Sequence, residues 1–143
     1  MLESMLELAG QQVRYRYFRT RRELRVMLQQ FRKTRFRYLH LACHGNRDGF
    51  AFTLDELRFA EAARLFAPYL AGKRLFLSAC SVGRRSFARR LFRASNCLSV
   101  VGPDGPIGFA EAAIIWAAFY SKMRMFDKKH MANQEIKGCM NQL

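Results

Sequence analysis

The sequence predicts an α/β fold with a mainly parallel sheet. Short apolar runs alternate along the chain with segments whose apolar residues recur at helical spacing, and the connections between them are short. This alternation is typical of parallel strands that are joined by helices. The length of 143 residues, half of which are apolar, predicts a single domain over residues 1–143.

Two strands and a helix are predicted in the first third of the chain. Apolar residues alternate with arginines over Val13–Phe18, which predicts a half-buried strand at an edge of the sheet. Thr20 and Glu23 then form the pattern of a capping box, which predicts the start of a helix. Phe36–Cys43 is almost continuously apolar, as expected of a strand that is covered on both faces.

The remaining elements continue the alternation of strand and helix. Strands are predicted where short apolar or β-branched runs are closed by turn residues, and helices where apolar residues share one side. The predicted strands are Gly49–Thr53, Arg74–Ala79 and Leu98–Val101. The predicted helices are Leu54–Leu70, Ser86–Ser95, Gly108–Met123 and Gln134–Leu143.

The chain is strongly basic, with 25 Lys and Arg against 11 Asp and Glu and a formal net charge of +14. Such a charge attracts polyanions or acidic proteins. Arginines are concentrated between Arg14 and Arg37, and a second cluster contains Arg84, Arg85, Arg89, Arg90 and Arg93. Two interpretations stay open at this point: solvated faces of amphipathic elements, or a surface that binds nucleic acid or an acidic protein.

Composition also predicts the compartment. The longest apolar stretch, Ala112 to Tyr120, is too short to cross a membrane, and Met1 to Gln12 has neither the basic start nor the apolar middle of a secretory signal. Four cysteines without a CxxC pair predict free thiols, with no disulfide framework and no structural zinc. We therefore expect a cytoplasmic protein with no metal site, and the glycine spacing predicts no nucleotide cofactor.

A cysteine and a histidine end two of the predicted strands. His44 follows Phe36–Cys43, and Cys80 follows Arg74–Ala79. Parallel sheets bind ligands beyond the carboxyl ends of their strands, so these two side chains can meet there. A thiol attacks a carbonyl as thiolate and needs a neighbouring imidazole to take its proton. Gly45 offers an unshielded N–H for the oxyanion that forms.

The segments around these residues resemble the active-site blocks of the CHAT family, caspase-like cysteine peptidases of the separase and caspase superfamily. Leu39 to Gly45 reads LHLACHG, and Leu75 to Gly83 reads LFLSACSVG. Val100 to Pro103 and the helix that ends at Tyr120 resemble the two blocks that follow, so the resemblance covers about residues 36–122. It implies a three-layer caspase-like domain that cleaves a protein substrate.

The resemblance also implies roles for three residues. His44 would be the general base and Cys80 the nucleophile of an endopeptidase that forms an acyl-enzyme. The backbone amides of Gly45 and Cys80 would form the oxyanion hole. Asp48 and Asp104 lie on loops at the same edge, where a cap or turn role and a pocket for a basic substrate residue both stay open.

The chain departs from the family pattern in two places. Family members carry a further strand and helix before the region that matches Val13, where only Met1 to Gln12 stand here, so we expect a minimal or amino-terminally truncated domain. Ser81 follows the cysteine where the family often has an acidic residue. We therefore expect an activating partner or a second copy to complete the sheet at the edge formed by Val13–Phe18.

Other histidines and cysteines predict no chemistry. His40 and His44 are four residues apart, as in a zinc-peptidase helix, but no Glu follows His40 and the segment reads as a strand, so His40 is expected to be structural. Cys43, Cys97 and Cys139 are expected to be inert, Cys43 because it faces away from His44. The rival to the peptidase is a non-catalytic basic α/β module that binds nucleic acid or an acidic protein.

Overall fold

The computed structural model describes residues 2–80, 85–126 and 133–141. Ser81 and Arg84, which the sequence singled out, lie outside the described residues. The chain divides into two compact units, one of Arg16–Ile107 and one that joins Met1–Tyr15 to Gly108–Leu143. The single domain over residues 1–143 stays a prediction.

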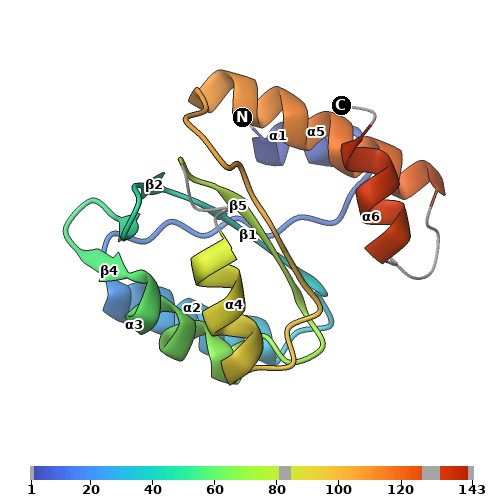
Figure 1. The fold of residues 1–143 in the computed structure, drawn as a ribbon. Coiled ribbons are helices and arrows are strands. Elements are labelled where there is room, and N and C mark those ends of the chain that lie inside the picture. Colours follow the sequence, from blue (N-terminus) through green and yellow to red (C-terminus); the bar gives the residue numbers. More distant parts are fainter. Residues whose placement is uncertain (1, 81–84, 127–132, 142–143) are drawn as a thin grey trace. The chain divides into compact units, whose positions relative to one another are not determined.

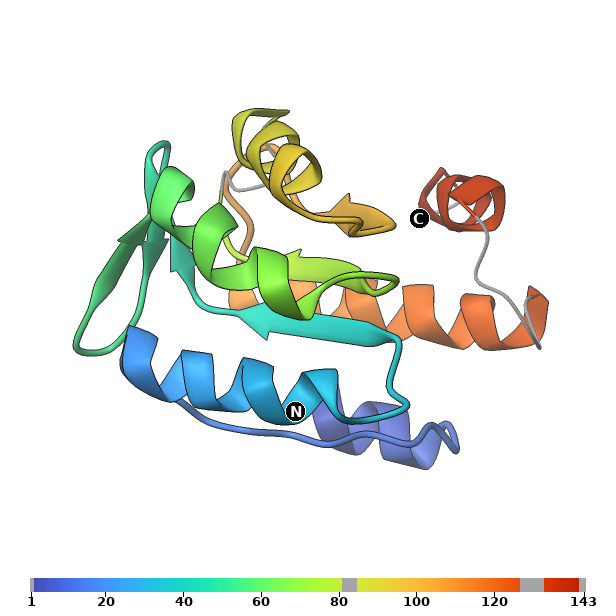
Figure 2. The same cartoon turned by 90° about the horizontal axis from the view of Figure 1, so that it is seen from below.

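The Arg16–Ile107 unit contains a parallel sheet. Its three strands have the order β1-β5-β6, and each neighbouring pair is parallel. Helices α2, α3 and α4 cover one face of this sheet (Figures 1 and 2). The strands are β1 (Tyr38–Ala42), β5 (Arg74–Ser78) and β6 (Ser99–Val101), and the helices are α2 (Arg21–Arg32), α3 (Phe59–Phe66) and α4 (Arg85–Ala94). The predicted α/β class with a mainly parallel sheet is confirmed.

The start of α2 is the predicted one. The side chain of Thr20 accepts a hydrogen bond from the N–H of Glu23 at 3.2 Å, and the Glu23 carboxylate accepts from the N–H of Thr20 at 3.1 Å. Both halves of the capping box are therefore present and satisfy donors that a helix start leaves free. Leu24 and Leu28, one turn apart, are buried in the core.

A small antiparallel sheet follows β1. It consists of β2 (His44–Gly45), β3 (Gly49–Ala51) and β4 (Glu56–Arg58). The prediction of a small strand from Gly49 is confirmed, but the prediction of one helix over Leu54–Leu70 is wrong at its start. Residues 56–58 pair with β3 and form a strand instead. In this strand Leu57 is buried opposite Phe50, and its two neighbours are exposed.

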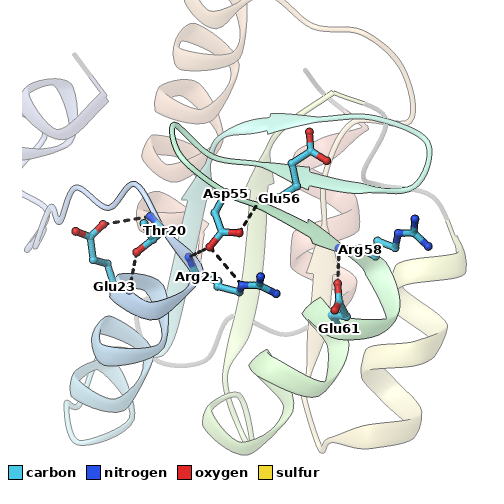
Figure 3. A network of polar contacts seen from close by, with 7 residues as sticks. All are labelled: Thr20, Arg21, Glu23, Asp55, Glu56, Arg58 and Glu61. Atoms are coloured by element: carbon cyan, nitrogen blue, oxygen red, sulfur yellow. Dashed lines mark hydrogen bonds and ion pairs between the residues drawn. The ribbon is translucent and has the colours of Figure 1, made fainter.

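Helix α3 begins after Arg58, whose N–H donates to the Glu61 carboxylate at 3.3 Å (Figure 3). It ends at Phe66, and a 3-10 turn, η1 (Ala67–Tyr69), follows with Pro68 near its start. Proline cannot continue the α-helical hydrogen bonding, which accounts for the change.

The strand predicted over Val13–Phe18 is absent from the structure, where residues 11–18 are irregular. The side chains of its last part contact the loop between β3 and β4 instead. Tyr17 shares a hydrogen bond of 3.1 Å with Thr53, and the rings of Phe18 and Phe52 pack edge to face at 5.0 Å. The edge of the parallel sheet that was predicted for Val13–Phe18 therefore belongs to β1.

Aromatic side chains fill the core beneath the helices of this unit. Four fully buried or nearly buried phenylalanine rings lie 5.1 to 6.4 Å from one another and come from β3, α3 and α4. They are Phe50, Phe59, Phe66 and Phe87. Leu75 and Leu77 of β5 belong to the same cluster, so this face of the sheet is apolar.

The second unit is helical and consists of α1 (Leu2–Leu8), α5 (Phe109–Phe126) and α6 (Asn133–Met140). The two helices predicted for this region are confirmed with shifted ends, and α1 was not predicted. The side-chain amide of Gln11 donates to the Tyr120 carbonyl at 3.1 Å and fastens the segment after α1 to α5. Among the described residues, no helix is long and apolar enough to cross a membrane.

Candidate active site

The two residues of the predicted dyad follow the carboxyl ends of adjacent parallel strands. β1 and β5 pair in register, with Ala42 opposite Ser78. The N–H of Cys43 donates to the Ser78 carbonyl at 3.2 Å, so the contact between the two segments reaches the residue before His44. His44 and Cys80 each stand two residues after the last paired position of β1 and β5.

His44 and Cys80 lie beyond the regular part of the parallel sheet. Leu77 belongs to the core beneath the helices, whereas His40 and Ser78 share a hydrogen bond on the opposite face. His44 belongs to β2, which pairs with β3 in the small sheet, and Cys80 lies in a turn after β5, so the alternation of the two strands does not extend to either side chain. The His44 side chain is exposed and Cys80 is half-buried.

The backbone N–H of Gly45 points away from β3. The N–H of Asn46 donates to the Gly49 carbonyl at 3.0 Å, which makes these two residues a hydrogen-bonded pair. The next pair of the antiparallel ladder, Gly45 and Phe50, is then of the other kind, in which neither residue donates to its partner.

A backbone carbonyl accepts the proton of the candidate nucleophile. The S–H group of Cys80 donates to the carbonyl oxygen of Ile107, with 3.6 Å between sulfur and oxygen. Nothing in the sequence indicates the contact, because a backbone carbonyl leaves no side-chain pattern.

The other three thiols are less suited to attack. Burial raises the pKa of Cys43 to about 12, and burial also raises the pKa of Cys97 and Cys139. A higher thiol pKa leaves less thiolate at neutral pH. Cys43 packs against the core cluster, as expected of a residue that faces away from His44. All four cysteines are free, which confirms that part of the prediction.

A network of polar contacts fastens the loop between β3 and β4 to the start of α2 (Figure 3). The carboxylate of Asp55 accepts from the backbone N–H of Arg21 at 3.2 Å and lies 3.3 Å from its guanidinium. The other oxygen of Asp55 accepts from the N–H of Glu56 at 3.1 Å. Because β3 also pairs with β2, this network supports the small sheet that carries His44 and Gly45.

The two acidic residues of the predicted substrate pocket lie on different loops. Asp48 is exposed in the turn between β2 and β3, where its N–H donates to the side chain of Asn46 at 2.8 Å and its carbonyl accepts from Phe59 at 2.9 Å. Asp104 is exposed in the segment that follows β6. For Asp48 the backbone contacts are those of a turn, and the pocket role of either carboxylate stays a prediction.

The sequence did not reveal one polar contact between the side chains of β1 and β5, near their carboxyl ends. The Nε2 atom of His40 and the hydroxyl oxygen of Ser78 are 2.8 Å apart. Desolvation of the ring lowers the pKa of His40 to about 4, so the imidazole is neutral at neutral pH. The only hint in the sequence was spacing: His40 stands four residues before His44, and Ser78 stands two residues before Cys80.

No three His, Cys, Asp or Glu side chains gather into a group able to hold a metal ion in the part of the chain that the structure describes. Comparison with models of protein families finds no match, and no curated protein and no solved structure matches the chain.

Proposed function

We propose that the protein is a cysteine endopeptidase that resembles the CHAT family, with a three-layer caspase-like fold, and that it cleaves a protein substrate in the cytoplasm. The observation that supports this most is the position of His44 and Cys80, which follow the carboxyl ends of two parallel strands that are neighbours in the sheet, β1 and β5. Cytoplasmic conditions keep the thiols reduced, and the reaction uses no cofactor.

Acylation starts with transfer of the Cys80 thiol proton to the His44 imidazole. The thiolate attacks the scissile carbonyl carbon, and the N–H groups of Gly45 and Cys80 stabilise the resulting oxyanion. The carbon–nitrogen bond then breaks while His44 returns its proton to the departing amine. The product of this half-reaction is a thioester between Cys80 and the amino-terminal part of the substrate.

Deacylation uses the same groups in a second cycle. His44 takes a proton from water, the hydroxide attacks the thioester carbon, and the same two amides stabilise the second oxyanion. The carbon–sulfur bond breaks, Cys80 regains a proton and the carboxyl product leaves. The outward direction of the Gly45 N–H supports its part in both steps.

Activation requires the Cys80 thiol to leave the Ile107 carbonyl, because the proton that goes to His44 is the one that this carbonyl accepts. We propose that a second copy of the chain, or a separate activating protein, shifts this contact. The edge position of β1 supports the idea, since an added strand there would lie beside the strand that leads to His44.

Labelling with electrophilic peptide probes tests the proposal. We expect a peptidyl acyloxymethyl ketone to label Cys80 faster than Cys43, Cys97 and Cys139, because burial raises the pKa of those three thiols. Probes that end in Arg, Asp or Leu compare cleavage-site preferences, and a preference for Arg that Asp48→Asn or Asp104→Asn removes would assign the pocket. Mass spectrometry of the labelled peptides gives the rates.

The controls separate activity from general thiol reactivity. Labelling should stop at this position in Cys80→Ala and slow in His44→Ala, and it should rise with protein concentration as the mass in solution increases. Equal labelling of all four cysteines would contradict the dyad. Full labelling of a dilute monomer would contradict the need for a partner.

A second function is favoured by the position of the arginines. Four of them on α2 and three on α4 are exposed: Arg21, Arg22, Arg25, Arg32, Arg89, Arg90 and Arg93. We propose as the alternative a non-catalytic module that uses these helices to bind nucleic acid or an acidic protein. The two functions make opposite predictions for Cys80→Ala, which abolishes peptidase activity and leaves binding intact.

A further inference from the structure

One side-chain hydrogen bond joins the two strands that lead to the candidate dyad. In the register of β1 and β5, His40 lies opposite Phe76, and Ala42 lies opposite Ser78. The 2.8 Å contact between His40 Nε2 and the Ser78 hydroxyl is therefore diagonal, since it reaches two residues further along β5. Side-chain pairs across neighbouring strands, diagonal ones included, stabilise the pairing of those strands.

We propose that His40 and Ser78 are positioning residues, whose hydrogen bond holds the ends of β1 and β5 so that the side chains of His44 and Cys80 face each other. This inference rests on the proposed peptidase function. Neither residue is proposed to touch the substrate. Each acts through the strand end that follows it.

The hydrogen bond lies between a packed part of this face and an open one. Phe76, opposite His40, is fully buried, and its ring packs edge to face against Tyr38 of β1 at 5.9 Å. Ala42, the last residue of β1, has a short and exposed side chain. The hydrogen bond between His40 and Ser78 therefore adds a restraint on the side of the ring contact that is nearer to His44 and Cys80.

The chemistry of the pair suits a fixed geometry. Desolvation keeps the His40 ring neutral, so Nε2 and the hydroxyl form a bond between uncharged groups, with either atom able to donate. Losing one partner leaves the other without its bond in a desolvated place, and losing both removes that penalty. Comparing the single variants with the double variant therefore separates a loss of stability from a loss of the correct position of the strand ends.

The test measures alkylation of Cys80 by iodoacetamide as a function of pH, together with the thermal midpoint of each variant. The variants are His40→Leu, Ser78→Ala, the double variant of both, and His40→Gln, whose amide nitrogen replaces Nε2. Ser99→Ala is the matched control, because it removes a hydroxyl that accepts from Arg74 at 3.1 Å at the other end of the same sheet. Peptide mass spectrometry assigns the label to Cys80.

At the protein concentration that gives the fastest labelling by the peptide probe, we expect His44 to speed alkylation of Cys80 in the wild type at pH 6 by taking the thiol proton, and Ser78→Ala and His40→Leu to lose about tenfold or more of that rate. The double variant should recover thermal stability and not the rate at pH 6. His40→Gln should recover both in part, and Ser99→Ala should change only stability. Should His40→Leu fail to fold, Ser78→Ala and His40→Gln carry the comparison.

Two other results would overturn the inference and are distinguishable. If the variants unfold more easily but alkylate Cys80 at the wild-type rate at pH 6, the pair is structural and the dyad stands. If the wild type itself is alkylated at pH 6 no faster than His44→Ala, the dyad is wrong, and the positioning role is wrong with it.

Discussion

The pKa values of His40 and Glu23 are both lowered, but for different physical reasons. The Glu23 carboxylate accepts from the backbone N–H groups of Arg19 and Thr20, and these bonds, that of Arg19 above all, lower its pKa although desolvation acts in the opposite direction. His40 has its pKa lowered by desolvation alone. The first shift stabilises a charge at a helix start, and the second keeps a ring neutral within the sheet.

The lowered pKa of His40 predicts a loss of stability in mild acid. In the unfolded chain the imidazole takes a proton near its ordinary pKa of 6.5, whereas in the folded protein it does so only near 4. Between these values the unfolded state binds more protons, so the free energy of unfolding falls as the pH falls. The total is on the order of 3 kcal/mol, and the loss ends below pH 4.

Urea unfolding between pH 4 and pH 7 measures this effect, with His40→Gln as the comparison. Carboxylates that titrate in the same range contribute equally to both proteins, so the difference between the two curves belongs to His40. We expect the wild type to lose more stability than the variant as the pH falls. Parallel curves would show that the ring is hydrated in the folded protein.

At the scale of the elements, the small antiparallel sheet depends on a glycine. Gly49 lies opposite Arg58, and a Cβ at this position would lie 2.3 Å from the carbonyl oxygen of Leu57 and 2.9 Å from the Cα of Arg58. These are backbone atoms, which cannot turn aside as a side chain does. Any larger residue must therefore separate β3 from β4.

We expect Gly49→Ala to lower the free energy of unfolding by about 1–3 kcal/mol, because the overlap forces a backbone shift. The same shift moves β2, so Cys80 labelling by the peptide probe should also slow. Gly105→Ala is the control, since a Cβ there meets nothing within 4 Å. Equal thermal midpoints for the two variants would contradict the expected overlap.

An element start that depends on local interactions could be predicted from the sequence, whereas two segments whose structure depends on pairing with a distant segment could not. The start of α2 was predictable because Thr20 and Glu23 satisfy each other within one turn. Residues 56–58 were assigned to a helix because their strand exists only through the pairing of Leu57 with Phe50, which is not a local property. The strand predicted over Val13–Phe18 was wrong, because alternation of apolar and charged residues does not tell whether a neighbouring strand is there to pair with.

The candidate site divides in the same way. His44 and Cys80 could be singled out because each follows a strong apolar run, and the two strands formed by these runs are parallel neighbours. Ser78 was missed because the partner of a serine within an apolar run cannot be inferred until the neighbouring strand and its register are known. The Ile107 carbonyl was out of reach, since backbone groups carry no residue signature.

For the molecule as a whole, the net charge of +14 makes a prediction about polyanions. If the chain binds nucleic acid, the phosphates release counterions, so we expect affinity to fall by ~10³ or more between 50 and 200 mM salt, without sequence preference. Fluorescence anisotropy with duplexes of unrelated sequence measures this. Binding that is insensitive to salt would refute the electrostatic account, and absence of binding at 50 mM would leave the arginines as a solvated surface.

The division of the chain into units also has a consequence for its synthesis. Helix α1 contacts α5, yet the whole of Arg16–Ile107 is translated between them. At the usual speed of translation, this separates the two helices by roughly 5–20 s. A helix of 7 residues with none of its side chains buried is not stable alone in water. We therefore expect α1, although it is translated before the parallel sheet, to become stable only after that sheet has assembled.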